Sequence, residues 1–160
     1  MRRFLSAFFN YSAGLRSGLR STRAAAPKGV AVPGKFQEYK ASAEQGDAEA
    51  QFNLGWCYDD GRGVAKDYVE AVKWYRQAAE QGHAEAQFNL GCCYANGQAV
   101  VKDKVEAYAW FSMAARADAD AAERRNLLRK ELTPKQFTDA QKRMKELRWQ
   151  IAAKSKSSTP

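Results

Sequence analysis

Residues 48–81 read AEAQFNLGWCYDDGRGVAKDYVEAVKWYRQAAEQ, and most of this stretch returns 36 positions later in the chain. When residues 46–81 are laid on residues 82–117, 21 of the 36 positions are identical. A repeat of this length is typical of helical solenoids, in which each unit buries its apolar face only against its neighbours. The sequence therefore predicts an all-α fold that serves recognition rather than chemistry.

Each unit carries the signals of two helices. Ala50, Leu54 and Tyr58 recur at four-residue spacing and give the first helix of the unit one apolar face. Asp67 and Asp103 are placed to cap the second helices of the two units, and Gly82 is placed to end the first of these helices. The pattern divides the middle of the chain into three parts, namely a partial leading repeat helix at 36–45, repeat one at 46–81 and repeat two at 82–117.

The order of these residues resembles the Sel1-like repeat (SLR), a relative of the tetratricopeptide repeat. Unit one matches its two helices and its glycine loop at Ala48, Ala50, Gln51, Leu54, Gly55, Tyr58, Gly61, Gly63, Val64, Asp67, Ala71, Trp74, Tyr75, Ala78 and Ala79. Unit two departs at Ala99, where the loop has its second glycine, and at Phe111, where the motif has tyrosine. The resemblance implies a short right-handed alpha-alpha solenoid of helix pairs that binds proteins in complex assembly, quality control or signalling.

The repeat pattern fades after residue 117, and residues 118–151 are predicted to form a partial repeat and a capping helix. Thr133 offers an N-cap, Pro134 suits the first helical position and Gln136 completes a capping box. The apolar residues that follow at three- and four-residue spacing are Phe137, Ala140, Met144, Leu147 and Ile151. We expect this helix to cover the open end of the solenoid, and residues 152–160 to be a disordered tail.

Residues 1–35 form a separate basic leader and linker, with seven basic side chains and no acidic one. Its apolar residues fall on one side of a helix, and an Arg-rich, Ser-rich, acid-free amphipathic segment is typical of a mitochondrial transit peptide. The alternative is a basic tail on a cytoplasmic protein, including one of a bacterial cytoplasm. Residues 132–141 favour that alternative, because they are similar to the ends of many bacterial SLR proteins. The sequence has no transmembrane span.

The formal charge of +8 is unevenly distributed. Residues 36–123 carry 8 basic and 15 acidic side chains, a net −7, whereas residues 124–160 carry 11 and 3, a net +8. A face for phosphate groups would have to lie in this C-terminal part, where only Phe137 and Trp149 accompany the basic side chains. Nucleic acid is therefore an unfavoured partner.

Residues that could carry chemistry are few. Cys57 and Cys93 occupy the same repeat position, and with Cys92 they lack the spacing of a metal site, so free buried thiols are predicted. The single histidine, His83, has no nucleophile or orienting carboxylate in its pattern, and no phosphate loop or dinucleotide fingerprint occurs. We expect no enzyme activity, no cofactor, no metal and no small-molecule substrate.

The candidate partner-binding residues lie where the spacing turns the first helices away from the core. They are Glu49, Asn53 and Trp56 in unit one and Glu85, Asn89 and Cys92 in unit two. A row of asparagines could pair with the backbone of an extended peptide, and Trp56 could supply an apolar anchor. The alternative is that the asparagines are solvated and that Trp56 packs on the leading helix.

Three functions remain. The first is a non-catalytic adaptor or assembly scaffold that binds a protein or peptide partner on the concave solenoid face. The second is a structural subunit held permanently in a larger complex, and the third is a basic-tail binder of nucleic acid or of a membrane surface. Because two full units make only a short groove, self-association through an open end is a further alternative.

Overall fold

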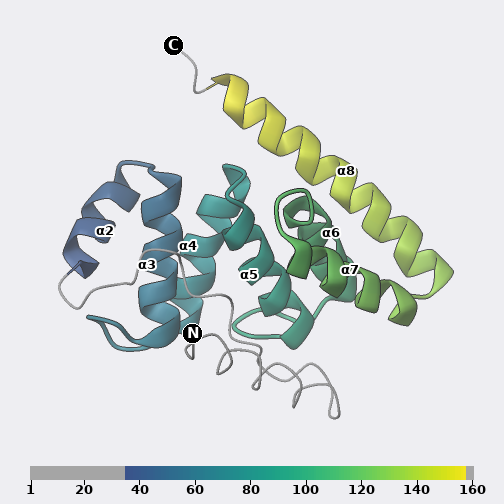
Figure 1. Cartoon of the computed structure of the whole chain (residues 1–160), viewed down its shortest axis with the longest axis horizontal. Coiled ribbons are helices and arrows are strands. Elements are labelled where there is room, and N and C mark those ends of the chain that lie inside the picture. Colours follow the sequence, from purple (N-terminus) through teal and green to yellow (C-terminus); the bar gives the residue numbers. More distant parts are fainter. Residues whose placement is uncertain (1–34, 158–160) are drawn as a thin grey trace, which may run out of the picture.

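The computed structural model describes residues 35–157, which form seven helices and no strand (Figure 1). The basic leader lies outside the described residues, except for Lys35. The helices are α2 (Phe36–Glu44), α3 (Ala48–Asp60), α4 (Tyr68–Glu80), α5 (Ala84–Asn96), α6 (Lys104–Ala114), α7 (Ala119–Glu131) and α8 (Pro134–Ser157). Consecutive helices from α2 to α7 pack on one another, which confirms the predicted all-α arrangement of solenoid-like helix pairs.

The helices begin and end where the sequence places polar and glycine residues. Asp67 and Asp103 cap α4 and α6, as predicted, and each side chain accepts hydrogen bonds from two backbone amides of the first turn. Gly61 and Gly97 follow the first helices of the two repeats with φ of 75° and 74°. This left-handed conformation costs glycine little and other residues more, so the helices stop at these positions.

Small residues allow the two helices of each repeat to approach closely. A Cβ atom added at Gly55 would lie 2.8 Å from the Tyr75 ring, and one added at Gly91 would lie 2.7 Å from the Phe111 ring. The aromatic ring of each second helix therefore lies against the bare backbone of the first. Protein interiors are packed without spare space, so glycine is required at both positions.

Buried glutamines join each first helix to the preceding helix. Gln51 Nε2 donates to the Ala43 carbonyl oxygen at 3.1 Å, and Gln87 Nε2 donates to the Ala79 carbonyl oxygen at 3.0 Å. Because these contacts are one repeat apart, the same hydrogen bond fixes α3 on α2 and α5 on α4. A buried amide without such a partner would lower the stability of the fold.

The loops between the paired helices keep one conformation despite a sequence change. Ala99 replaces the glycine found at Gly63, yet its φ of 56° lies in the same left-handed region as the 73° of Gly63. The change from glycine to alanine therefore keeps the loop conformation, but it puts a residue with a Cβ atom into the left-handed backbone conformation, which such residues disfavour.

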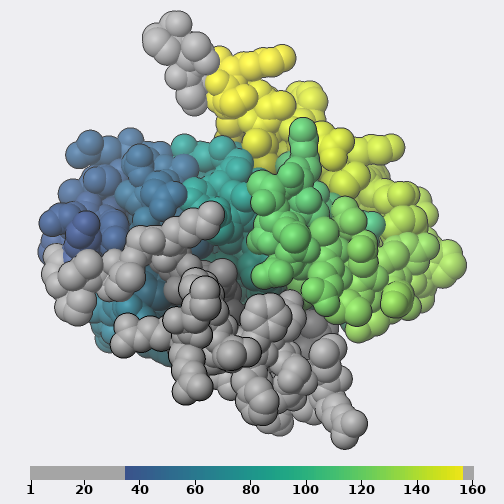
Figure 2. All heavy atoms as spheres, in the orientation of Figure 1, coloured from purple at the N-terminus to yellow at the C-terminus, as the bar shows by residue number. Residues whose placement is uncertain are grey.

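The last helix, α8, starts with the predicted capping box. Gln136 N donates to Thr133 Oγ1, and Gln136 Oε1 accepts from the Thr133 amide. The helix packs on α6 and reaches back to α4, so it runs along the side of the second helices, whereas α7 packs on the end of repeat two through Ala121 and Leu128. In the space-filling view it lies along the outer edge of the body (Figure 2).

Two ion pairs and an apolar stripe attach α8 to the repeats. Arg143 pairs with Glu106 of α6, and Lys154 pairs with Glu80 of α4, while Leu147 is buried between these contacts. Because α8 continues to Ser157, the prediction of a disordered tail from residue 152 is wrong for residues 152–157. The Lys154 pair extends the attachment of the helix beyond the apolar stripe that the sequence analysis identified.

Candidate functional site

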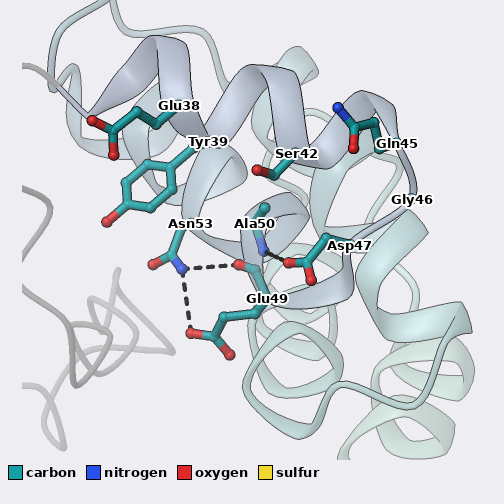
Figure 3. A pocket seen from close by; sticks show the side chains of 9 residues that line it. All are labelled: Glu38, Tyr39, Ser42, Gln45, Gly46, Asp47, Glu49, Ala50 and Asn53. Atoms are coloured by element: carbon teal, nitrogen blue, oxygen red, sulfur yellow. Dashed lines mark hydrogen bonds between the residues drawn. The ribbon is translucent and has the colours of Figure 1, made fainter.

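A pocket opens between α2 and the beginning of α3 (Figure 3). It has a volume of about 670 Å3, and both helices and the turn between them contribute side chains. Its lining residues are Glu38, Tyr39, Ser42, Gln45, Gly46, Asp47, Glu49, Ala50 and Asn53. Two of the predicted site residues, Glu49 and Asn53, are therefore brought together here.

Asn53 is the innermost polar residue of the pocket, with 6% of its surface exposed. Its Nδ2 donates to the backbone oxygen of Glu49 at 2.9 Å and to Glu49 Oε1 at 3.2 Å. Its Oδ1 is buried and accepts no hydrogen bond among the described residues. Figure 3 shows this oxygen turned away from Glu49 and toward the side on which Tyr39 lies.

The carboxylates of the pocket differ in how they are held. Asp47 caps α3 by accepting from the Ala50 amide at 2.6 Å. Glu49 Oε2 lies 2.9 Å from His83 Nε2, at the beginning of α5, and this contact joins the pocket to repeat two. Glu38 extends from the exposed side of α2. Of the three pocket carboxylates, Asp47 is thus held by a backbone amide, Glu49 is shared with His83, and Glu38 is exposed.

Tyr39 forms the aromatic wall of the pocket. Burial raises the pKa of its hydroxyl, and the charges of Cys57, Glu38 and Glu49 raise it further. The phenol therefore stays protonated and keeps a hydrogen-bond donor at the pocket edge across the physiological range.

The predicted row of outward-facing residues is wrong in four of its six positions. Glu49 and Glu85 are exposed, but Asn53, Trp56, Asn89 and Cys92 are buried. The reason is that α3 packs against both α2 and α4, and α5 against both α4 and α6, so that little of either helix faces solvent. Trp56 lies under the Arg62 guanidinium, whose carbon is 4.1 Å from the ring centroid, and supplies no free anchor.

Sequence reasoning missed the α2 half of the pocket, namely Glu38, Tyr39 and Ser42. The repeat period relates these positions to Trp74, Tyr75 and Ala78, which pack inside the solenoid. Their equivalence to packed positions gives no sign that they are accessible, and no local motif marks the place where a truncated leading unit leaves its helix open. Their accessibility follows from where the array starts.

The three cysteines are free and buried, as predicted. Burial raises the pKa of the Cys92 and Cys93 thiols to about 12. Thiols in this state are poor nucleophiles and poor metal ligands, since both roles need the thiolate. Within residues 35–157, no group of three histidine, cysteine or carboxylate side chains is arranged to hold a metal ion.

The described helices include none with the length and apolar composition needed to cross a membrane.

The pocket between α2 and α3 supplies hydrogen-bond acceptors, negative charge and an aromatic wall on a pair of helices joined by hydrogen bonds. Such a set can bind a polar or cationic group of another molecule.

The Sel1 repeat matches residues 48–83 and 84–118 of the chain. A protective antigen of uropathogenic Escherichia coli strains that displays an SLR fold is similar over 78% of this chain and 28% of its own, with 36% identity and a TM-score of 0.69. A Sel1 repeat protein from Oxalobacter formigenes is similar over 57% of this chain and 38% of its own, with 46% identity and a TM-score of 0.56. No curated protein gives a match.

This chain thus spans well under half the length of either solved protein. The matched residues cover the two helix pairs from α3 to α6. Sel1 repeat proteins generally mediate protein–protein interaction and are generally non-catalytic. The two matched repeats, their helix-pair geometry and the two solved relatives together show that residues 48–118 form two Sel1 repeats with the helix-pair arrangement of the SLR fold.

Proposed function

We propose that the chain is a non-catalytic adaptor or assembly scaffold that binds a protein or peptide segment at the pocket between α2 and α3. The observation that carries this proposal is the pocket lined by Asn53, whose Oδ1 is buried just beneath the pocket surface and has no hydrogen-bond donor among the described residues. A buried acceptor without a donor costs about 1–3 kcal/mol, and a bound segment would supply the donor. The family's general role in protein–protein interaction agrees with this use.

The rigidity of the pocket supports peptide binding. Gln51 fixes α3 to α2, and Gln81 Nε2 donates to the Gly46 carbonyl oxygen at 2.9 Å and to Gln51 Oε1 at 2.7 Å. A preformed site loses little conformational entropy when it binds a segment, so even a small contact area gives measurable affinity.

A substitution that fills the pocket tests the proposal. Ser42 is exposed and lines the pocket, so Ser42→Arg places a long side chain across it without disturbing the core. Ala41→Arg is the matched control, because Ala41 is exposed on the same helix and is not a lining residue. Proteins that co-purify with the wild type and with the control, but not with Ser42→Arg, are the expected partners. Equal recovery with all three would refute binding at the pocket.

The outer face of α8 supports a second function, binding to an anionic surface. Trp149 is 73% exposed, and Lys142, Lys145 and Lys156 are exposed at positions that follow the same side of the helix. Binding of a single-stranded oligonucleotide that weakens steeply between low and moderate salt, and that is lost in Trp149→Ala, would support this function. Salt-independent or absent binding would exclude it.

A further inference from the structure

The charge of the pocket between α2 and α3 indicates what kind of group it accepts. Three of its nine lining residues, Glu38, Asp47 and Glu49, are carboxylates, and none is lysine, arginine or histidine. His83 at the beginning of α5 lies outside this lining and contacts Glu49, with 2.9 Å between His83 Nε2 and Glu49 Oε2. The lining therefore carries uncompensated negative charge.

The hydrogen-bonding groups of the pocket point the same way. Asn53 is nine-tenths buried, and its Oδ1 lies beneath the pocket surface without a partner among the described residues, while its Nδ2 is already occupied by Glu49. The exposed carboxylate of Glu38 supplies further hydrogen-bond acceptors at the edge of the pocket. A ligand that fits must therefore bring several donors and positive charge, which excludes carboxylates and phosphates.

An aromatic wall completes the set. Tyr39 lines the pocket next to Glu38, and aromatic rings attract cations over their faces. A guanidinium group is planar, carries five N–H donors and stacks on aromatic rings, whereas an ammonium group is a compact charge with three donors. Because the pocket places acceptors of Glu38 and Asn53 in different directions beside the Tyr39 ring, it favours arginine over lysine.

The repeat period shows that this site belongs to one position in the array. One repeat later, Glu38, Ser42 and Asp47 are replaced by Trp74, Ala78 and His83. Ala78 is buried, and Trp74 packs near Leu54, so the equivalent place between α4 and α5 lacks both the charge and the opening. The acidic pocket is therefore a feature of the leading end rather than of the repeat motif.

We infer that the pocket is a binding site for the arginine side chain of a basic peptide segment in a partner protein, with the guanidinium pairing with Glu38 and donating to Asn53 Oδ1 after the Asn53 side chain rotates this oxygen into the pocket. This inference rests on the proposed function and names the chemistry of the partner. Residues 36–123, which contain the pocket, carry a net charge of −7 within a chain of +8, so the attraction of an arginine-rich segment is local to the surface of the repeats.

Two short peptides test the inference on the full chain. The first is N-acetyl Ala-Arg-Ala-Arg-Ala amide, and the second has citrulline in place of arginine, which keeps the shape but removes the charge. In ¹H–¹⁵N NMR spectra we expect the arginine peptide to shift the Asn53 side-chain amide and the Glu49 backbone amide in a saturable manner. The citrulline peptide should leave them unchanged. Equal shifts with both peptides, or shifts with neither in any form of the chain, would overturn the inference.

Matched substitutions separate a built site from general charge attraction. Glu38→Gln should raise the Kd of the arginine peptide by about two- to fivefold, the effect of one partly exposed ion pair. Glu44→Gln makes the same charge change on an exposed, non-lining residue of α2 and should leave the Kd unchanged. Equal weakening in both variants would overturn the site in favour of non-specific attraction.

The chain's own basic leader is the competing occupant. If the peptide binds only after Arg16, Arg20 and Arg23 are replaced by glutamine, the arginine site stands but its occupant is the leader, and the partner assignment is overturned. The proposed function is judged separately. If the peptides fail and Ser42→Arg still removes a partner, the arginine inference alone fails. If the arginine peptide binds and Ser42→Arg has no effect on partners, the proposed function alone fails.

Discussion

The two repeats share 21 of 36 residues, yet their second helices lie in different surroundings. Trp74 in α4 is half-buried beside α2, whereas the equivalent Trp110 in α6 is 1% exposed in a core that includes Leu147 of α8. The short α2 packs on repeat one, whereas repeat two is covered by α7 at its end and by the long α8 along its second helix. The neighbours of each repeat therefore decide whether a shared residue acts as core or borders an open surface.

The strongest test of this contrast removes each tryptophan. Trp110→Ala should lower the free energy of unfolding by about 3–5 kcal/mol, because it leaves a cavity under α8 that the packed helices cannot fill. Trp74→Ala should cost clearly less, since part of its surface is already in water. Urea unfolding of both variants measures the difference. Equal losses would mean that α8 does not stabilise repeat two as its contacts imply.

The glycines of the first helices test whether the repeats are equally tight inside. Gly91→Ala would place Cβ 2.7 Å from the Phe111 ring, and Gly55→Ala would place it 2.8 Å from the Tyr75 ring and 3.1 Å from the Ala71 carbonyl oxygen. Both should lower stability by about 1–3 kcal/mol through overpacking. We expect the larger loss at Gly55, because a backbone oxygen moves less easily than a ring. Thermal unfolding compares the two, and no loss in either would contradict the tight contact.

The Sel1 motif explains why so much of the fold was predictable. The Asp67 and Asp103 caps and the Thr133 capping box depend on neighbouring residues, so spacing alone identifies them. Burial of Asn53 and Trp56 was not predictable in this way, because it depends on helices that enclose α3 from two sides. The α2 half of the pocket was missed for another reason, because the repeat period relates Glu38, Tyr39 and Ser42 to positions that pack against the core in repeat one.

A correlated pair of differences distinguishes the interiors of the repeats. In repeat one, the Tyr75 hydroxyl donates to Asp59 Oδ2 at 3.5 Å, whereas repeat two has Phe111 and Ala95 at these positions. Repeat two therefore lacks both the donor hydroxyl and the acceptor carboxylate. Loss of the Tyr75 hydroxyl alone would remove one donor from the half-buried Asp59, which would keep its hydrogen bond from Gln98 Nε2.

A double-mutant cycle with Tyr75→Phe and Asp59→Ala measures this coupling. The double variant recreates the pair of repeat two, so it should be more stable than the sum of the single losses predicts. The 3.5 Å distance indicates a weak bond, and we expect a coupling of about 0.5 kcal/mol. Additive losses would show that the correlation has no energetic basis.

The pH dependence of the Asp59→Ala loss provides a check within the same cycle. Burial raises the Asp59 pKa above its usual 3.8, more than Lys66, Gln98 and Tyr75 lower it. The native state therefore binds this proton more tightly than the unfolded state, and its contribution to stability falls as the pH rises through the folded pKa. The cost of Asp59→Ala should accordingly be larger at acidic than at neutral pH. A cost that grows with pH would contradict the burial of this carboxyl.

The smallest expected difference between the repeats lies in their loops. Ala99 has a φ of 56°, and relief of this left-handed strain by Ala99→Gly should stabilise the fold by about 1 kcal/mol before the unfolded chain is considered. Glycine gives the unfolded chain more freedom, which offsets about 0.4–1 kcal/mol, so the net gain should be a few tenths. Gly63→Ala should have the opposite sign, because its Cβ would also lie 3.0 Å from Phe36. If both substitutions lower stability equally in urea unfolding, then the Ala99 loop is not strained, and its alanine is as well accommodated as the glycine of repeat one.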